Sequence, residues 1–551
     1  MRPTTLTAWL SEKRVGLALG ALTGWMLLAT LPYLSDFPLV DWAQPMIAAP
    51  AYKLVSQGIY GSDMFTGFYR SEWRNYDHMP LYPMLLAVSF KMLGTGVWQA
   101  RLVSVFSGLV VVWLTFALGR RLYGASVGLA AAGLLCVMRL GLPNPYDVLR
   151  LGYQMNASGI PLLDFARVIR FDVLVPAWVV AAGLCFYRAQ ARDARRWYLA
   201  AGACAGLATL THLYGGFVLA VLILAHVWHA GRRAFRRAPL VLMLAGCALV
   251  MLPYVVYALQ DIDAYRGQML RHEARFDLLN PAFYLDSLGR EPWRYLSWLG
   301  GSLDQAVWWP RVGLWVMAAG VAAANLVLVR RIRHSPQLAD RLLLISLPVL
   351  AGLLGLLINV KRYPYTSLLM PFIALQVGLA IVAAWRSVGR HRRLIHGMIG
   401  VALAALTVEG AAGIANSFQM GAATTPYQAI VDAVRRAIPS GARVVSSHVA
   451  WFGLAGYDMR SANLVFVLSD PQYGYARMLS VDEVLQHIDP EYIVMEDRLL
   501  KTYLREPASL PDERVVTLWR MFDEYIQRHC GDIAARVPAP DYGDVTVYHC
   551  R

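Results

Sequence analysis

Charged residues are scarce in this chain. Only 16% of its 551 residues are Asp, Glu, Lys or Arg, whereas 57% are hydrophobic. Soluble globular domains usually carry about 25% charged residues, so this scarcity excludes an ordinary soluble protein. Acidic residues number 36 against 51 Lys and Arg, which gives a net charge of +15. The basic residues fall in short clusters between apolar runs rather than along one face of a soluble domain, so the charge does not indicate a nucleic-acid partner.

Cysteine is also sparse, and the chain has neither an internal repeat nor a low-complexity tract. Cys530 and Cys550 lie in the polar C-terminal segment. A disulfide between them is expected if that segment faces an oxidising compartment, and two unrelated free thiols are the alternative. The other four lie in apolar runs, where they are expected to pack as small hydrophobic side chains: Cys136, Cys185, Cys204 and Cys247.

Long apolar runs fill the chain from residue 16 to residue 415. Clusters of Arg or polar, aromatic loops separate them, as expected when helices cross a hydrocarbon layer about 30 Å thick. The first run, from about Gly16 to Leu34, follows Lys13 and Arg14, and no small-residue cleavage site follows it. We therefore expect a signal-anchor helix that stays in the mature protein.

Six basic clusters predict how these runs cross the membrane. The positive-inside rule places all six in the cytoplasm, so an even number of crossings separates each consecutive pair. The apolar stretch from Leu81 to Leu93 would break this parity, and at 13 residues it is too short to span, so an interfacial or re-entrant helix is predicted there. The clusters are Lys13/Arg14, Arg120/Arg121, Arg188 to Arg196, Arg232 to Arg237, Arg330 to Arg341 and Arg386 to Arg393.

This parity predicts about eleven spans and an external C-terminus. The external surface then comprises a first loop at about 35–100, loops at about 141–170 and 259–309, the turn at Lys361 to Pro364, and everything after about Asn416. The predicted spans are the first helix and the segments 101–119, 125–140, 171–188, 198–212, 213–230, 239–258, 310–329, 342–359, 364–385 and 395–415.

The composition changes after about residue 416, which predicts a transmembrane domain at 1–415 and a soluble domain at 416–551. Residues 425–428, Thr-Pro-Tyr-Gln, are typical of a helix start. Alternating apolar runs then predict strands, and with the helices they form a small α/β module. The predicted strands are Arg443 to Ser447, Leu464 to Leu468, Tyr492 to Met495 and Val545 to Tyr548, with a helix at Val481 to Ile488.

Two carboxylates at external ends of spans are candidate functional groups. Asp41 follows the first span, and Asp172 begins a later one. Charge near the bilayer is costly and is usually paired or functional. Asp41 could instead be a solvated helix cap, and Asp172 could pair with Arg167 or Arg170 to anchor a helix end.

Asp77 and His78 open the predicted interfacial helix. They are candidates for a substrate contact or for ligands of a divalent metal, the one cofactor that the sequence leaves open. A metal site usually needs a third and a fourth donor, so a polar helix cap is the alternative.

Together these segments resemble the glycosyltransferase-C superfamily, and in particular the bacterial family 39 proteins that include protein O-mannosyltransferases and lipid A aminoarabinose transferases. The resemblance covers about residues 16 to 415. The chain departs from the usual family pattern at four positions. Trp42 stands where the family usually has an acid, Met79 and Phe171 stand where it has proline, and His212 stands where it has lysine. The landmarks are Asp41, His78-Met-Pro-Leu-Tyr82, Ala100-Arg-Leu-Val-Ser104, Gly119-Arg-Arg-Leu-Tyr-Gly124, Arg170-Phe-Asp172, Gly206 to His212 and Lys361-Arg-Tyr363.

The resemblance implies an inverting glycosyltransferase. It implies a polyprenyl-phosphate sugar donor, such as an undecaprenyl-phosphate sugar, and transfer to a hydroxyl or phosphate of a glycan, lipid or protein acceptor. It also implies a bacterial inner membrane, with the N-terminus cytoplasmic and the soluble domain periplasmic.

The resemblance also assigns expected roles. Asp41 would be the acceptor-side base and Asp172 a second active-site carboxylate. Independently of the resemblance, positive charge at the predicted external ends of the spans could stabilise a departing phosphate, and the candidate donor-phosphate contacts are Arg170, Arg271, Arg275, Lys361 and Arg362. Candidate substrate contacts are Asp77, His78, Tyr82 and Tyr363.

Two other functions stay open at this point. A transporter or flippase of lipid-linked sugars would also need many spans, but the two halves of the chain show no matching broken helices of the kind that mark inverted repeats. A non-catalytic assembly protein for envelope glycans could use the α/β module to recruit partners.

Overall fold

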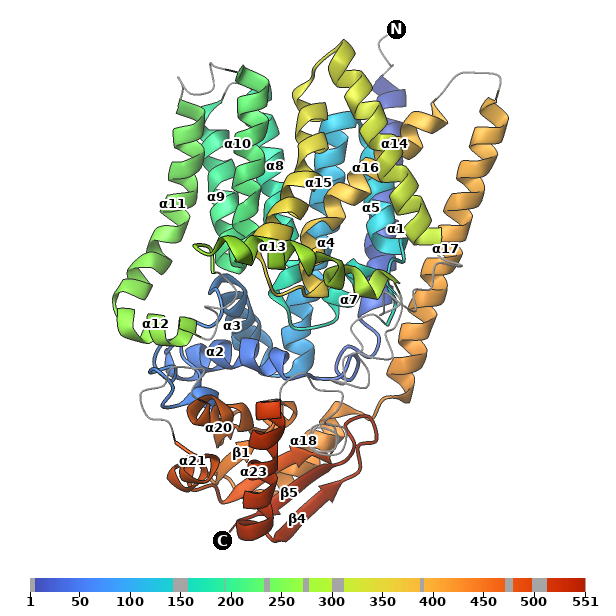
Figure 1. Ribbon diagram of the computed structural model, residues 1–551. Coiled ribbons are helices and arrows are strands. Elements are labelled where there is room, and N and C mark those ends of the chain that lie inside the picture. The colour runs from blue at the N-terminus through green and yellow to red at the C-terminus, as the bar shows by residue number, and fades with distance from the viewer. Residues whose placement is uncertain are drawn as a thin grey trace.

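The computed structural model describes residues 5–141, 157–192, 194–231, 238–270, 277–299, 312–386, 391–470, 479–497 and 513–550. Long helices form a bundle with the N-terminus at one end, and a five-stranded sheet with its helices lies beyond the other end (Figure 1). Short helices lie between these two parts. The predicted fold class, a multi-pass helical membrane protein with a C-terminal α/β module, is confirmed.

The long helices occupy the predicted spans. Among the residues that the structure describes, seven helical segments are long and apolar enough to cross a membrane by length and composition, and α5 and α16 are shorter apolar helices. The helices of the bundle are α1 (Thr5–Thr30), α4 (Val97–Tyr123), α5 (Ala125–Val137), α8 (Val175–Arg192), α9 (Arg195–Thr211), α10 (Phe217–Ala230), α11 (Ala238–Leu259), α14 (Val312–His334), α15 (Leu338–Leu357), α16 (Met370–Trp385) and α17 (Arg392–Ala423).

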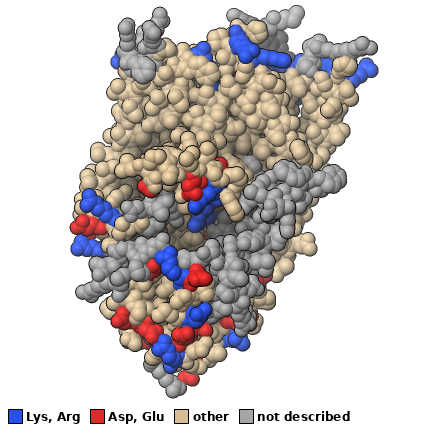
Figure 2. All heavy atoms as spheres, in the orientation of Figure 1, with Lys and Arg blue, Asp and Glu red and all other residues tan. Residues whose placement is uncertain are grey.

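The charges follow the predicted pattern. Lys and Arg gather on the rim of the bundle, a broad band below them shows almost no charge, and both signs mix in the lower half (Figure 2). Arg120 and Arg121 lie in the last turn of α4, and Arg331 and Arg333 lie in the last turn of α14. The side of the membrane that this rim faces stays a prediction.

Short helices form a layer between the bundle and the module. The predicted interfacial helix is α3, which begins at Leu81 and ends at Leu93, where Gly94 takes a positive φ of 85°. The layer comprises α2 (Ala43–Gln57), η1 (Asp63–Phe65), α3 (Leu81–Leu93), α7 (Pro161–Ala166), η2 (Phe171–Val173), η3 (Leu213–Gly216), α12 (Ile262–Leu270), α13 (Pro281–Gly289), η6 (Glu291–Leu299) and η7 (Tyr363–Leu368).

The soluble module is built on one mixed sheet with the strand order β2-β1-β3-β5-β4. Strand β1 runs parallel to β2 and β3, and β5 runs antiparallel to β3 and β4. The elements are α18 (Tyr427–Ala437), β1 (Arg443–Ser446), η8 (His448–Ala450), α19 (Trp451–Leu454), β2 (Asp458–Ser461), α20 (Ala462–Ser469), α21 (Val481–Ile488), β3 (Tyr492–Glu496), α23 (Glu513–His529), β4 (Asp532–Val537) and β5 (Val545–His549).

One predicted strand is wrong. Leu464 to Leu468 belongs to helix α20, because the Ser461 side chain accepts a hydrogen bond from Asn463 N and starts a buried helix there. A short apolar run with no alternation does not distinguish a buried strand from a buried helix. The structure joins Cys530 and Cys550 in a disulfide.

Close helix packing in the bundle generates the first prediction. A Cβ at Gly202 of α9 would lie 1.9 Å from the Met243 carbonyl oxygen of α11, so this glycine lets the two backbones touch. Gly202→Ala is expected to cost about 1–3 kcal/mol of stability through overpacking and to lower Tm in detergent. Gly183→Ala in α8 is the control, since its Cβ would make an ordinary 3.7 Å contact with Leu118. Equal Tm values for the two variants would contradict this packing.

Candidate functional site

A cavity of about 1150 Å³, counted with its open mouth, lies where the bundle meets the layer of short helices. Its walls come from α2, the segment at 76–79, η2, the start of η3, the C-terminal end of α11, α12 and the turn at 358–365. Five polar groups face it: Asp77, His78, Arg170, His212 and Arg362. Its aromatic lining consists of Trp42, Tyr76, Phe171, Tyr254, Tyr265 and Tyr365.

Arg170 is held in the cavity wall by a buried carboxylate. Its Nε donates a hydrogen bond to Asp172 Oδ2 at 2.9 Å, and Asp172 is fully buried. The Tyr214 hydroxyl donates to the other oxygen, Oδ1, at 2.8 Å. Asp172 therefore pairs with Arg170 rather than Arg167, and it lies behind the cavity wall instead of in it.

Arg362 is held over an aromatic ring. Its guanidinium carbon lies 5.7 Å from the ring centroid of Trp42, a cation–π distance, and both residues line the cavity. The two lining arginines thus approach the cavity from two different elements, η2 and the turn before η7.

Asp41 lies beside the cavity and caps a helix. Its Oδ1 accepts hydrogen bonds from Ala43 N at 2.8 Å and Gln44 N at 2.9 Å, at the start of α2. The cap that the sequence left open as an alternative is therefore present. Trp42 and Ala43, the next two residues, line the cavity.

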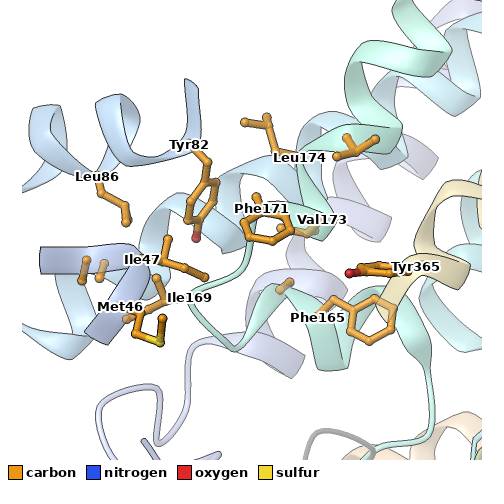
Figure 3. Packing of buried hydrophobic residues seen from close by; sticks show 14 of the residues in the cluster. Met46, Ile47, Tyr82, Leu86, Phe165, Ile169, Phe171, Val173, Leu174 and Tyr365 are labelled. Atoms are coloured by element: carbon orange, nitrogen blue, oxygen red, sulfur yellow. The ribbon is translucent and has the colours of Figure 1, made fainter. Parts of the chain in front are cut away.

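Asp77 and His78 lie side by side on the cavity wall, with 3.0 Å between Asp77 Oδ2 and His78 Nδ1, and they form an ion pair when the imidazole is protonated. The Phe171 ring lies 6.0 Å from the His78 ring and stacks on the His212 ring at 4.8 Å. Figure 3 shows Phe171 between α2, which carries Met46 and Ile47, and Tyr365. Within the part of the chain that the structure describes, no group of three or more His, Cys, Asp or Glu is placed to hold a metal ion.

Lys361 is not part of the cavity lining, and its polar contacts stabilise the cavity wall. Its Nζ contacts Glu291 at 2.9 Å, Ser287 Oγ at 3.0 Å and the Gly355 carbonyl at 2.8 Å. Arg294 also pairs with Glu291 and lies 5.7 Å from the Tyr365 ring. Burial alone would raise the pKa of Glu291, but Arg294 and Lys361 outweigh it and hold this pKa below its ordinary value.

Two further predicted substrate contacts, Tyr82 and Tyr363, are not part of the cavity lining. The Tyr82 hydroxyl is buried and donates to Ser104 Oγ at 2.6 Å. The Tyr363 ring packs 5.2 Å from Phe165. Arg271 and Arg275 lie outside the described residues.

Sequence reasoning missed most of the aromatic wall. Trp42 and His212 were noted only as departures from the family pattern, and Tyr254, Tyr265 and Tyr365 were not named. The available signal was weak: aromatic residues at external ends of helices are also typical of an interfacial belt.

Two segments of the chain match known families. Residues 77–144 and residues 162–262 each match a family described as dolichyl-phosphate-mannose-protein mannosyltransferase. Over these two segments the chain is similar to the protein mannosyltransferase family. This is a family of polyprenyl-phosphate-sugar-dependent glycosyltransferases, and the matched segments contain Asp77, His78, Arg170 and Asp172.

Solved structures of this family's fold are similar along most of the chain. ArnT from Cupriavidus metallidurans bound to undecaprenyl phosphate is 15% identical with a TM-score of 0.61, over 98% of each chain. The Archaeoglobus fulgidus oligosaccharyltransferase AglB, in complex with an inhibitory peptide and a dolichol-phosphate, is 12% identical with a TM-score of 0.56. That match covers 91% of this chain and 71% of AglB. No curated protein matches the chain. These likenesses show the predicted glycosyltransferase-C fold.

The Arg170–Asp172 pair generates a stability prediction. Asp172→Asn leaves the Arg170 charge buried without its anion and is expected to cost about 3–5 kcal/mol. The double variant, Asp172→Asn with Arg170→Gln, is expected to recover part of this loss because no charge is then buried unpaired. A double-mutant cycle of unfolding in detergent measures the coupling, and additive effects would contradict the pairing.

Proposed function

We propose that this protein is an inverting glycosyltransferase that moves a sugar from an undecaprenyl-phosphate donor to a hydroxyl or phosphate of an envelope acceptor. The acceptor is a glycan, a lipid or a protein on the periplasmic face of a bacterial inner membrane. The observation that carries this proposal is the cavity, which combines two arginines, a carboxylate and an aromatic wall at the level where the spans end.

Arg170 and Arg362 are the proposed donor-phosphate contacts. Guanidinium groups match phosphate geometry through paired N–H donors, and both arginines line the cavity. The position at the ends of the spans lets a prenyl tail stay in the hydrocarbon layer while its phosphate reaches the arginines. Relatives of the same fold were solved with undecaprenyl phosphate and with dolichol phosphate, which supports this donor class.

The aromatic wall is the proposed sugar contact. Trp42, Phe171 and Tyr365 offer ring faces from three different elements, and sugar rings carry apolar C–H faces that pack on such rings. The Trp42 ring is also fixed by Arg362, so one surface would orient both the sugar and its phosphate.

The proposed reaction is a single displacement. The acceptor oxygen attacks the anomeric carbon, and the bond from that carbon to the phosphate oxygen breaks. Undecaprenyl phosphate leaves with the electron pair, and its charge is stabilised by Arg170 and Arg362. The acceptor proton passes to a carboxylate base, and the anomeric configuration inverts.

Two carboxylates are candidates for the base. Asp41 is the candidate that the family resemblance supplies, and because its Oδ1 already caps α2, its Oδ2 would take the proton. Asp77 is the second candidate, because it lines the cavity and contacts His78. Asp172 has the positioning role of orienting Arg170.

The decisive experiment measures sugar transfer in membranes from a panel of radiolabelled undecaprenyl-phosphate sugars. Removing the base is expected to lower the rate by about 10²–10⁴-fold. Asp41→Asn and Asp77→Asn are compared with wild type at matched protein levels, and Asp263→Asn, an exposed carboxylate of α12, is the control. Asp41 is expected to be the residue whose loss abolishes transfer from the preferred donor.

Collapse in Asp77→Asn alone would move the base to Asp77. Equal transfer in both variants and wild type would remove carboxylate catalysis and favour transport or assembly. A wild type that moves no sugar from any donor would overturn the proposed function itself.

A further inference from the structure

The carboxyl ends of the parallel strands in the soluble module point toward the membrane part of the chain. In open α/β sheets this edge is where ligands usually bind. Here His448 follows β1, and Ser461 ends β2. Both side chains are buried, and the segment that reaches them is the start of the first external loop.

His448 holds the backbone of Trp42. Its Nδ1 is hydrogen-bonded to the Trp42 carbonyl oxygen, and its Nε2 to Ser461 Oγ. A carbonyl only accepts, so Nδ1 carries a proton and donates. The Phe65 ring lies edge-on, 6.2 Å from the imidazole.

Two further contacts from the module fix the same segment. Tyr427 N donates to Asp36 Oδ1 at 2.9 Å, and Val40 N donates to the Tyr542 hydroxyl at 2.9 Å. With His448, the module therefore holds the loop at positions 36, 40 and 42, on both sides of Asp41.

The segment held in this way carries the wall of the cavity. The Trp42 ring lines the cavity beneath Arg362, and the Trp42 peptide is followed at once by α2, which Asp41 caps. A shift of the Trp42 carbonyl would move the ring, the Arg362 contact and the Asp41 carboxylate together. Geometric errors near 1 Å at a reacting centre can cost about 10²-fold in rate.

We infer that His448 is a positioning residue, through which the soluble module holds Trp42 and Asp41 in their working geometry. This inference rests on the proposed function for its catalytic consequence. The first loop of the same chain covers these strand ends, where open α/β sheets usually bind a ligand. This edge of the module therefore binds a segment of its own chain.

The test compares His448→Phe with His448→Asn in the full-length chain. The asparagine amide can place an N–H near the position of Nδ1 and keep the bond to Trp42, whereas phenylalanine has no donor. His487→Asn is the matched control, because His487 is an exposed histidine in the last turn of α21. Ser461→Ala, which removes the partner of Nε2 together with the N-cap of α20, is a second variant that leaves the His448 side chain in place in case the phenylalanine disturbs folding.

The first measurement is hydrogen exchange of the segment 36–47 in detergent. His448→Phe is expected to speed exchange there about tenfold or more while peptides from β1, β3 and β5 stay protected. His448→Asn is expected to lie close to wild type, and His487→Asn to match it. Unchanged exchange of the segment in His448→Phe, with the module folded, would overturn the inference.

The second measurement is sugar transfer, with undecaprenyl phosphate binding as a separate readout. His448→Phe is expected to lower kcat about 10- to 100-fold with a smaller change in KM, and His448→Asn to restore most of the rate. Faster exchange with a wild-type transfer rate would also overturn the inference. If wild type transfers no sugar, the proposed function fails, and exchange together with weakened undecaprenyl phosphate binding in His448→Phe still decides the positioning role.

Discussion

Two buried guanidinium groups fix the chain between α1 and α2, and the site depends on them. Arg101 donates to the carbonyls of Leu34 and Pro38, and Arg167 donates to carbonyls at 29, 32 and 37. A buried charge needs hydrogen bonds, and irregular backbone near the bilayer needs donors for its carbonyls. The guanidinium groups supply the donors, and the loop carbonyls supply the acceptors. The loop therefore leaves the bundle along one path, and Asp41 and Trp42 begin α2 at the edge of the cavity.

The cations near the cavity divide into two groups by their contacts. Arg170 and Arg362 face the cavity, one oriented by buried Asp172 and the other by the Trp42 ring. Lys361, although it precedes Arg362 directly, turns away and neutralises Glu291. A substrate phosphate would meet the first group alone. The second group is represented by Lys361. Because Glu291 compensates its charge, the turn before η7 can pack closely against the bundle.

The sequence predicted the spans and part of the site because those features are local. Hydrophobic length and basic clusters specify each span, and Asp77, His78, Arg170 and Arg362 stand in short motifs whose positions in the fold follow from the spans. Side-chain partners depend on distant elements. Lys361 is predicted from the sequence to contact phosphate, but it pairs with Glu291, and this pairing could not be predicted because Glu291 lies about 70 residues away in the chain. The aromatic wall forms where several external segments converge, and β4 was missed because it is an exposed edge strand without alternation.

The sheet order determines when the loop gains its support during synthesis. Strand β5 is the last element of the chain, yet it lies inside the sheet between β3 and β4. The sheet therefore cannot close until β5 has been made, after the spans have been synthesised. Chains generally fold domain by domain from the N-terminus, so the bundle forms first and its first loop waits for the module. A ribosome that stops before β5 would leave an inserted bundle whose cavity wall has no outer support.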